Sequence, residues 1–327
     1  DWASPVKQSL RNSEGSGAVS AVTPGVLMST GYYFYNAVLM SKMAAVLGRN
    51  SDEIKYRELA GRIKEAFNIR FYNDASGQYA GGSQASNVFP LFLGIVEDSN
   101  TRVVLENVLK DVIEHNNYHV TTGNLCTKYL LEVLSENGHS DTACKILTQT
   151  TYPSLGYMIS QGATTVWERW ELATGNAMNS HNHGMYGSVD SWFYKVLCGI
   201  NADECGPGFE KIVIKPHMID CITFAEASLK TIMGLVECGW EKDGNSSCIK
   251  VAIPANSTCI IHIPVDESKL ESIMVTESGK LLWSKSGYHH GINGIYAGTH
   301  SNGHIVFEAG SGEYHFNISY IRGSQYV

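Results

Sequence analysis

The amino-acid sequence predicts a chain of two parts, a helical toroid over residues 1–204 and an antiparallel β-sandwich over residues 205–327. Before residue 205, apolar residues recur at three- and four-residue steps, which is the spacing of one face of a helix. After Cys205-Gly-Pro-Gly208 the pattern changes to short alternating runs separated by Gly, Ser and Asn. Helices joined by short polar loops favour an all-helical first part over a fold in which strands and helices alternate.

Apolar spacing places three helices within the first part. One begins near Asn50, a candidate N-cap with Glu53 at the third helical position. A second covers residues 104–113, where apolar pairs recur every four residues, and a third covers residues 127–135. Ser140 can cap the helix that follows. The apolar positions of the first of these helices are Tyr56, Leu59, Ile63 and Phe67.

Strand patterns dominate the second part. Residues 211–215 alternate, and the run 231–240 is followed by Lys242-Asp-Gly-Asn245, a hairpin turn signal. Residues 248–253 are expected to pair back on that run. Three more runs of the same kind are 258–264, 304–307 and 313–318. Several short strands with frequent turn signals predict a sandwich.

Composition excludes some classes of partner. The chain has 327 residues and a net charge of −8, which argues against nucleic acid or an anionic membrane as a partner. No apolar run approaches the ~18 residues of a membrane-spanning helix. The sequence contains no recognisable signal peptide, and we expect a cytoplasmic location, with a periplasmic or secreted location as alternatives.

The segment Gly162–Trp170 holds the strongest candidate for chemistry. It places Glu168 between Trp167 and Trp170 and beside Arg169. Indole faces bind the apolar face of a sugar ring, and a carboxylate held there can take a proton from water. Arg169 could orient Glu168 or keep it ionised. The alternative is that the tryptophans are core residues and that Glu168 and Arg169 form a local ion pair.

A polar, glycine-bearing segment, Asn179–Asp190, follows shortly afterwards and leads into the apolar run 192–200, which we expect to form a buried helix. Such a loop on a rigid element is a common place for binding groups. We predict that His183, with Asn182 beside it, contacts sugar hydroxyls. His181 and His183 could also be metal ligands, but no cysteine or acid cluster completes a set, so we expect neither a metal nor another cofactor.

These motifs resemble a known family. The runs Gln149–Ile159, Gly162–Trp170 and Asn179–Trp192 are similar to the C-terminal catalytic half of bacterial alpha-L-rhamnosidases, glycoside hydrolase family 78. The upstream segments Tyr118–Asn124 and Ser83–Asn87 also resemble that family's barrel. The resemblance covers essentially the whole chain, and the second and third runs are specific when they occur together.

The resemblance implies an (α/α)6 barrel, a jelly-roll-like C-terminal β-sandwich, and hydrolysis of terminal alpha-L-rhamnosyl residues by an inverting mechanism. Glu168 matches the family's general base, and His183 matches a histidine that contacts rhamnose. The substrate is then a rhamnose-containing oligosaccharide or glycoside. The predicted substrate-binding residues are Trp167, Arg169, Trp170, Asn182 and His183.

One part of the family's pattern is missing. The general acid belongs to an Arg-Asp-Glu-Arg…Gly-Trp-x-Gly-Asp motif, which this sequence lacks. Glu171 and Asp190 are nearby acids, but neither matches that motif. An inverting glycosidase needs both an acid and a base. We therefore expect the acid on a segment absent from this chain.

The helical part also looks incomplete at its N-terminus. About seven or eight helices are expected before residue 205, whereas the family's barrel has twelve. An open toroid exposes apolar helix faces, so a missing N-terminal barrel region or self-association is expected to cover them. The alternatives for function are a catalytically incomplete carbohydrate-binding fragment and another (α/α)6 glycoside hydrolase.

Overall fold

The structure is a computed structural model that describes residues 1–5, 22–173, 180–244 and 246–320. The chain divides into two compact units, Asp1–Val189 and Asp190–Val327. The first is helical and the second consists mainly of antiparallel strands, as the sequence predicted. Among the helices of these residues, none combines the length and apolar character that crossing a membrane requires.

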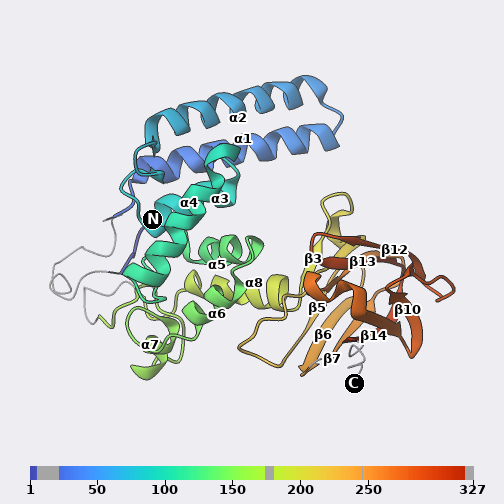
Figure 1. Ribbon diagram of the computed structural model, residues 1–327. Helices are drawn as coiled ribbons and strands as arrows, with labels where there is room; N and C mark the ends of the chain where they lie inside the picture. The colour runs from blue at the N-terminus through green and yellow to red at the C-terminus, as the bar shows by residue number, and fades with distance from the viewer. Residues whose placement is uncertain (6–21, 174–179, 245, 321–327) are drawn as a thin grey trace. The chain divides into compact units, whose positions relative to one another are not determined.

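Within its described residues, the helical unit is built from successive helical hairpins, and α1 and α2 form the first (Figure 1). Helices α3 and α4 form the second hairpin, and α5 and α6 form the third, while α3 packs on both α1 and α5. A short α7 follows the third hairpin. The bounds are α1 Gly25–Val46, α2 Asn50–Phe71, α3 Gln84–Leu93, α4 Asp98–Lys110, α5 Thr127–Glu136, α6 Ser140–Leu147 and α7 Leu155–Ser160.

The predicted helices are confirmed, but two of their predicted caps are displaced by one residue. Asn50 and Ser140 are the first residues of α2 and α6, whereas Arg49 and His139 occupy the N-cap positions. Neither cap residue makes a side-chain hydrogen bond to its helix end. Packing of the apolar faces therefore fixes where these helices begin more than capping does.

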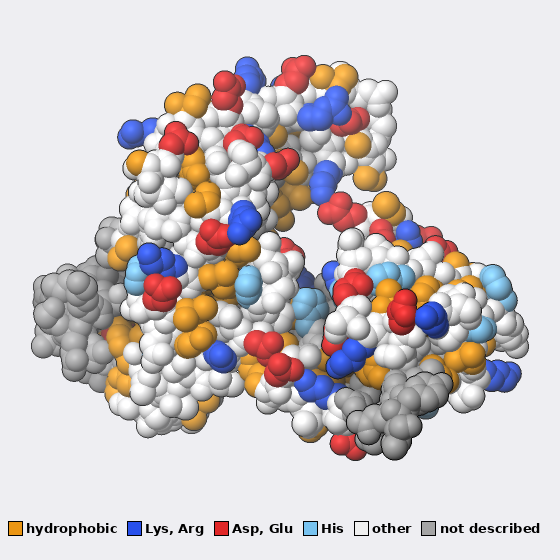
Figure 2. Space-filling view, in the orientation of Figure 1, with side chains coloured by type: hydrophobic (Ala, Val, Ile, Leu, Met, Phe, Trp, Pro, Cys, Tyr) orange, Lys and Arg blue, Asp and Glu red, His pale blue; other side chains and the backbone are white. Residues whose placement is uncertain are grey.

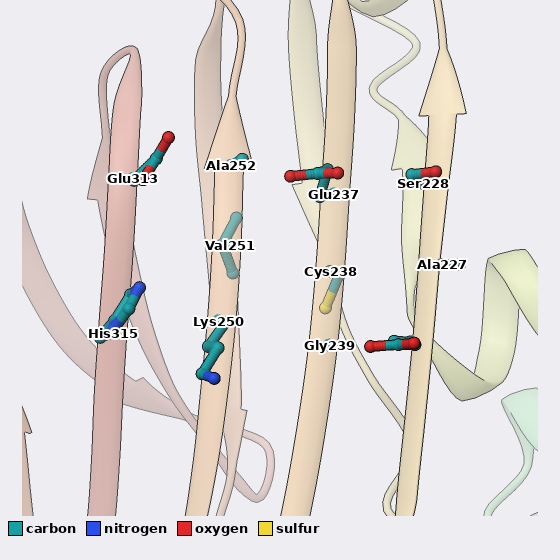
Figure 3. Close-up of a pocket in the computed structure, with 11 residues that line it drawn as sticks. Ala227, Ser228, Glu237, Cys238, Gly239, Lys250, Val251, Ala252, Glu313 and His315 are labelled. Atoms are coloured by element: carbon teal, nitrogen blue, oxygen red, sulfur yellow. The ribbon is translucent and has the colours of Figure 1, made fainter.

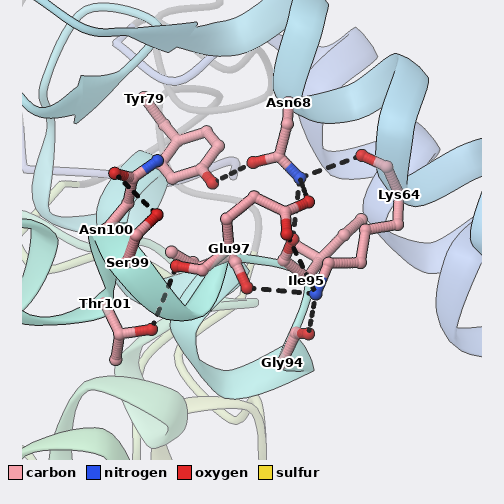
Figure 4. A network of polar contacts seen from close by, with 10 residues as sticks. Lys64, Asn68, Tyr79, Gly94, Ile95, Glu97, Ser99, Asn100 and Thr101 are labelled. Carbon is pink, nitrogen blue, oxygen red and sulfur yellow. Dashed lines mark hydrogen bonds and ion pairs between the residues drawn. The ribbon is translucent and has the colours of Figure 1, made fainter.

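Polar side chains of α2 tie the first hairpin to the second (Figure 4). The Asn68 side-chain N–H donates to the Ile95 carbonyl (2.8 Å), and its oxygen accepts the Tyr79 hydroxyl. The Lys64 ammonium donates to the Val96 carbonyl (3.2 Å). These bonds satisfy carbonyls at the turn between α3 and α4, where no N–H group of the helix is available to them.

The first turn of α3 is polar and buried, and it ties this helix to the loop before α5. Ser83 caps the helix by accepting the Ser86 N–H (3.1 Å). The Gln84 side chain donates to the His119 carbonyl (3.0 Å) and accepts the Thr121 N–H (2.7 Å). A fully buried glutamine with both ends paired fixes the position of the loop that follows residue 119.

The β unit consists of two sheets that enclose one core. Within the described residues, the larger sheet has the strand order β11-β10-β9-β14-β7-β6-β5, and the smaller has the order β12-β13-β8-β4-β3. All neighbours are antiparallel except β4 and β8, which pair in parallel. Inward residues alternate along the strands, so apolar side chains of both sheets meet between them.

The strand bounds extend the sequence prediction. Strands β4, β7, β8, β13 and β14 confirm predicted runs, and β6 begins and ends later than expected. The predicted turn residue Asn245 lies outside the described residues. The bounds are β3 Ile200–Ala202, β4 Lys211–Ile214, β5 Phe224–Lys230, β6 Leu235–Asp243, β7 Ser246–Ile253, β8 Thr258–Pro264, β9 Ile273–Glu277, β10 Lys280–Ser284, β11 Gly287–Tyr288, β12 Ile295–Ser301, β13 His304–Ala309 and β14 Gly312–Tyr320.

The boundary between the units lies earlier than the predicted 204/205 junction. Residues 190–204 pack with the strands: α8 (Asp190–Trp192) and the helical turn Phe193–Leu197 precede β3, which pairs with β4. The Trp240 indole N–H donates to the Leu197 carbonyl (2.7 Å). The sequence suggested a helix up to residue 200, and helical periodicity does not reveal the sheet on which that helix packs.

Candidate active site

Backbone hydrogen bonds bring the two predicted motifs side by side. The Glu168 N–H donates to the Ser180 carbonyl (3.0 Å), and the His183 N–H donates to the Val166 carbonyl (2.8 Å). Both segments lack regular secondary structure, so these bonds supply the partners that their backbone requires. Glu168 and His183 thus come from paired segments. Asn179, the predicted start of the second motif, lies outside the described residues.

Glu168 differs from its sequence neighbours in how much of its surface is exposed to solvent. Trp167, Arg169, Trp170 and Glu171 are between 1% and 4% exposed, whereas Glu168 is only partly buried. Among these five residues, Glu168 alone keeps access to solvent. It is therefore the side chain that can exchange a proton with water in this segment.

The two tryptophans pack inside the helical unit. The Trp170 indole N–H donates to the Thr122 carbonyl (2.9 Å), and its ring lies 4.1 Å from that of Tyr186. Trp167 packs against the His181 ring, with centroids 5.3 Å apart. Both indoles serve packing in this structure, as the alternative interpretation of the motif expects. Their contact with a sugar stays a prediction.

Arg169 forms a buried ion pair with Glu171. Its Nε lies 2.6 Å from Glu171 Oε1, and its Nη2 contacts the same oxygen. The sequence suggested Glu168 as the partner of Arg169 and did not suggest Glu171. Partners two residues apart do not face each other on a helix, so helix spacing rules could not find this pair. With its carboxylate held by Arg169, Glu171 is poorly placed to transfer a proton to a substrate.

Tyr186 is a buried residue of the site that sequence reasoning missed. Its hydroxyl donates to the Ala3 carbonyl (2.6 Å). Burial raises the pKa of this phenol well above its usual value, and the Glu171 carboxylate raises that pKa further. Tyr186 therefore stays a neutral donor. Its position within the Asn179–Asp190 motif is the sequence feature that could have identified it.

The loop 122–125 joins the Glu168 segment to the first residues of the chain. The Asp1 carboxylate accepts the N–H groups of Gly123 (2.6 Å) and Leu125 (3.0 Å). The Asn124 N–H donates to the Trp2 carbonyl (2.9 Å), and its side-chain N–H donates to the Glu168 carbonyl (3.1 Å). A Cβ on Gly123 would overlap the Trp2 oxygen, so this approach requires glycine.

Two buried polar atoms near this segment have no hydrogen-bond partner among the described residues. They are His183 Nδ1 and Asn124 Oδ1. Such atoms are uncommon in folded proteins because each forfeits its hydration, and they often mark sites of function or bound water. The side chains of His181 and Asn182 are exposed. The roles of His183 and Asn182 as sugar contacts stay predictions.

The described residues hold no group of three or more His, Cys, Asp or Glu side chains that could bind a metal ion. The β unit has a separate polar hollow of about 490 Å³ on the outer face of its larger sheet. In register across four strands lie Glu226, Gly239, Lys250 and His315, with Glu237 and Glu313 on the next row (Figure 3). Such a surface can accept and donate hydrogen bonds to a polar ligand, and the sequence reasoning did not identify it.

Comparison with known proteins identifies both units. Residues 1–197 match the model of the bacterial alpha-L-rhamnosidase 6 hairpin glycosidase domain, and residues 199–276 match that of the bacterial alpha-L-rhamnosidase C-terminal domain. An alpha-L-rhamnosidase of Streptomyces avermitilis is 32% identical over 318 residues, which is 94% of this chain and 28% of that protein. One from Formosa agariphila is 33% identical, over 82% of this chain and 29% of the relative.

Solved structures give the same result. The alpha-L-rhamnosidase from Dictyoglumus thermophilum matches with a TM-score of 0.86 and 37% identity, over 98% of this chain and 34% of that one. The Streptomyces avermitilis alpha-L-rhamnosidase complexed with L-rhamnose matches with a TM-score of 0.78 and 32% identity, over 91% and 27%. The chain thus spans about a third or less of the length of these relatives.

Proposed function

The chain belongs to the bacterial alpha-L-rhamnosidase family, and from this premise we propose that it serves the hydrolysis of terminal alpha-L-rhamnosyl residues, with Glu168 as general base. The observation that carries the proposal is the exposure of Glu168 among buried neighbours in residues 167–171. A partly exposed carboxylate, on a segment held by its own backbone bonds, fits a base that activates water.

The proposed reaction proceeds with inversion at the anomeric carbon. Glu168 takes a proton from water while the water oxygen forms a bond to that carbon, and the glycosidic C–O bond breaks. The leaving oxygen needs a proton from a second carboxylic acid, which in inverting enzymes lies about 6.5–9.5 Å from the base. Both proton transfers contribute to the rate, typically about 10²–10⁴-fold each.

We assign the acid to a segment outside residues 1–327. Glu171 is engaged by Arg169 in a buried pair, which supports excluding it. The absence of the family's acid motif from the sequence supports the same assignment. Glu168 then supplies one half of the catalytic pair.

The proposed substrate is a rhamnose-containing glycoside, and His183 and Asn182 are its proposed polar contacts. His183 supports this role because its Nδ1 is unpaired within the described residues and its backbone is bonded beside Glu168. Trp167, Arg169 and Trp170 are buried, and their proposed contribution to binding is to hold the segment that carries Glu168.

Helix α1 carries an apolar stripe that we propose is covered by further helical hairpins of the same barrel. Figure 2 shows apolar side chains on the surface of the α1–α2 hairpin. Exposed apolar residues recur there at every seventh position, the spacing of a helix-packing seam. They are Val26, Tyr33, Met40 and Leu47, which are 59%, 54%, 42% and 71% exposed. Self-association through this stripe is the alternative.

Release of nitrophenol from an aryl alpha-L-rhamnoside by the full-length protein tests the proposal. Wild type should turn the substrate over, and Glu168→Gln should abolish turnover while L-rhamnose still binds, because the side chain keeps its shape and loses its basicity. Turnover within a few-fold of wild type in that variant would remove Glu168 from the mechanism. L-Rhamnose binding by the wild-type protein without turnover would favour the carbohydrate-binding alternative.

A further inference from the structure

Asn124 connects the main chains of two segments that are far apart in sequence. Its backbone N–H donates to the Trp2 carbonyl (2.9 Å), and its side-chain Nδ2 donates to the Glu168 carbonyl (3.1 Å). The residue is 2% exposed. A buried side chain that bonds directly to the backbone of the proposed base can control where that base lies.

Chemistry fixes the orientation of the Asn124 amide. The Glu168 carbonyl oxygen can only accept a hydrogen bond, so the NH₂ end of the amide must face it. This orientation leaves Oδ1 buried, with no hydrogen-bond partner in the part of the chain that the structure describes. An unpaired buried acceptor lowers stability.

The loop that carries Asn124 is held on both sides. The Asp1 carboxylate accepts the N–H groups of Gly123 and Leu125. The Thr122 carbonyl accepts the Trp170 indole N–H (2.9 Å). With its neighbours fixed in this way, Asn124 presents its amide from a rigid support rather than from a mobile loop.

Glu168 is held from two directions as a result. Its N–H donates to the Ser180 carbonyl (3.0 Å), and its carbonyl accepts the Asn124 amide. The peptide groups on both sides of the Glu168 Cα are therefore restrained, and the direction in which the carboxylate leaves the backbone is fixed with them. Of these two restraints, only the one from Asn124 comes from a side chain, so only this one can be removed by substitution.

We propose that Asn124 is a positioning residue for the Glu168 carboxylate, an inference that rests on the proposed function. Asn124 orients the base through its backbone and does not touch the substrate. The side chain belongs to the Tyr118–Asn124 segment, which the sequence reasoning noted without giving any residue in it a role. Loss of the amide should change the rate of the chemical step and leave substrate binding intact.

Two substitutions in the full-length protein test this role. Asn124→Asp keeps the shape and replaces the donor by an oxygen, and Asn124→Leu removes both the donor and the unpaired acceptor. We expect kcat to fall about 10- to 100-fold in both, since small displacements of a catalytic group have costs of this size. KM and the Kd for L-rhamnose should not change. The Tm of the Leu variant should stay close to that of wild type, because the loss of the unpaired Oδ1 offsets the loss of the donor to the Glu168 carbonyl.

Thr127→Val is the matched control. Thr127 is buried in the same region, and its hydroxyl donates to the Gly123 carbonyl (2.8 Å) without bonding to Glu168. This variant should lose stability and keep its kcat. If Thr127→Val lowers kcat as much as the Asn124 variants do, loop stability explains the loss and the proposal fails. Wild-type kcat in both Asn124 variants would also overturn it.

A double-mutant cycle separates this proposal from the one on which it rests. In a Glu168→Gln background, Asn124→Asp should cause no further fall in the residual kcat that survives loss of the base, because the group that it positions is already gone. A further fall of the same size would mean that Asn124 acts independently of Glu168. Wild-type turnover in Glu168→Gln alone would defeat the proposed base itself, and the positioning role with it.

Discussion

The two units of the chain differ in how they bury apolar surface. The β unit encloses its core between two sheets, where Ile212, Ile261 and Phe316 are fully buried. Its exposed apolar side chains lie on separate strands and turns. In the helical unit, by contrast, seven large apolar residues are exposed within or beside α1 alone. They are Val22, Val26, Tyr33, Met40, Met43, Val46 and Leu47.

This difference shows that the proposed catalytic base resides in the unit that depends more on other surfaces for its packing. In the β unit, the inward face of each sheet packs against the other sheet. The helical unit holds the Glu168 segment with a buried polar network but leaves the stripe on α1 uncovered.

The largest expected effect appears when the units are produced separately. Residues 190–327 should fold alone and unfold cooperatively, because their core is closed within the unit. Residues 1–189 should bind a hydrophobic dye and self-associate through the exposed stripe. Circular dichroism with thermal unfolding, dye fluorescence and light scattering measure these properties. An unfolded β unit, or a monomeric helical unit that binds no dye, would contradict the proposed difference between the two units.

The second effect concerns the buried polar network of the helical unit. Arg169→Met should lower the free energy of unfolding by about 3–5 kcal/mol, because it leaves the Glu171 carboxylate buried and unpaired. Urea denaturation measures the loss. Replacing both partners by apolar residues, with Arg169→Met and Glu171→Leu together, should recover much of it.

An exposed ion pair provides the control for that experiment. Arg102 and Glu106 pair on α4 at 2.8 Å, and Arg102 is almost fully exposed. Arg102→Ala should leave the urea midpoint unchanged, since solvent screens such pairs. If Arg169→Met behaves like Arg102→Ala, the buried pair has no special role in the stability of the helical unit.

The third effect is a dependence of β-unit stability on pH. Burial is the main cause that lowers the pKa of His217 and of His262 to about 4, and the positive charge of Lys215 contributes to the value for His217. Both values lie below the ordinary histidine pKa of ~6.5. Between pH ~6.5 and ~4 the unfolded state therefore binds protons that the folded state does not bind. This contribution is complete above pH ~6.5 and is lost as pH falls towards 4.

The loss should be on the order of 2 kcal/mol for His217 by pH 4, after allowance for its partial exposure. Urea midpoints of the β unit between pH 7.5 and 4.5 measure it. His262→Asn should make the dependence shallower, because it removes one of the histidines whose pKa burial lowers. Equal midpoints across this range would show that these histidines do not titrate with unfolding.

The smallest effect on stability tests the stripe itself. Tyr33→Lys with Met40→Lys should change the free energy of unfolding by no more than about 0.5 kcal/mol, because both side chains are exposed. The same change should abolish dye binding and self-association of the helical unit. Phe34→Lys is the matched control: Phe34 is 7% exposed, so this variant should be strongly destabilised. Unchanged dye binding in the double variant would place the apolar surface elsewhere.

Much of the fold could be predicted from the sequence because local periodicity determines it. The helices at residues 50 and 127 begin within one residue of their predicted starts, and strand alternation located β4 and β7. The unit boundary could not be predicted in this way. The helical residues 190–197 look like their predecessors in sequence, and only their packing on the strands assigns them to the second unit.

The candidate site could be predicted only in part. The motifs identified Glu168 and His183 and the neighbourhood of both. The contacts of Asn124 with Trp2 and of Asp1 with the loop at Gly123 join residues more than a hundred positions apart. The pair between Arg169 and Glu171 does not follow helix spacing, and neither residue lies in a strand. Such contacts arise from tertiary structure, and no local pattern encodes them.

The one parallel strand pair of the described sheets has a consequence for the order of folding. Lys211 on β4 lies opposite Thr258 on β8, and strands β5, β6 and β7, which belong to the other sheet, come between them in sequence. Closing that loop costs chain entropy before any pairing compensates for it. The hairpins β5–β6 and β6–β7, with close partners, should therefore form first and bring β4 and β8 together. During synthesis on the ribosome, the smaller sheet cannot grow beyond the β3–β4 pair until β8 emerges.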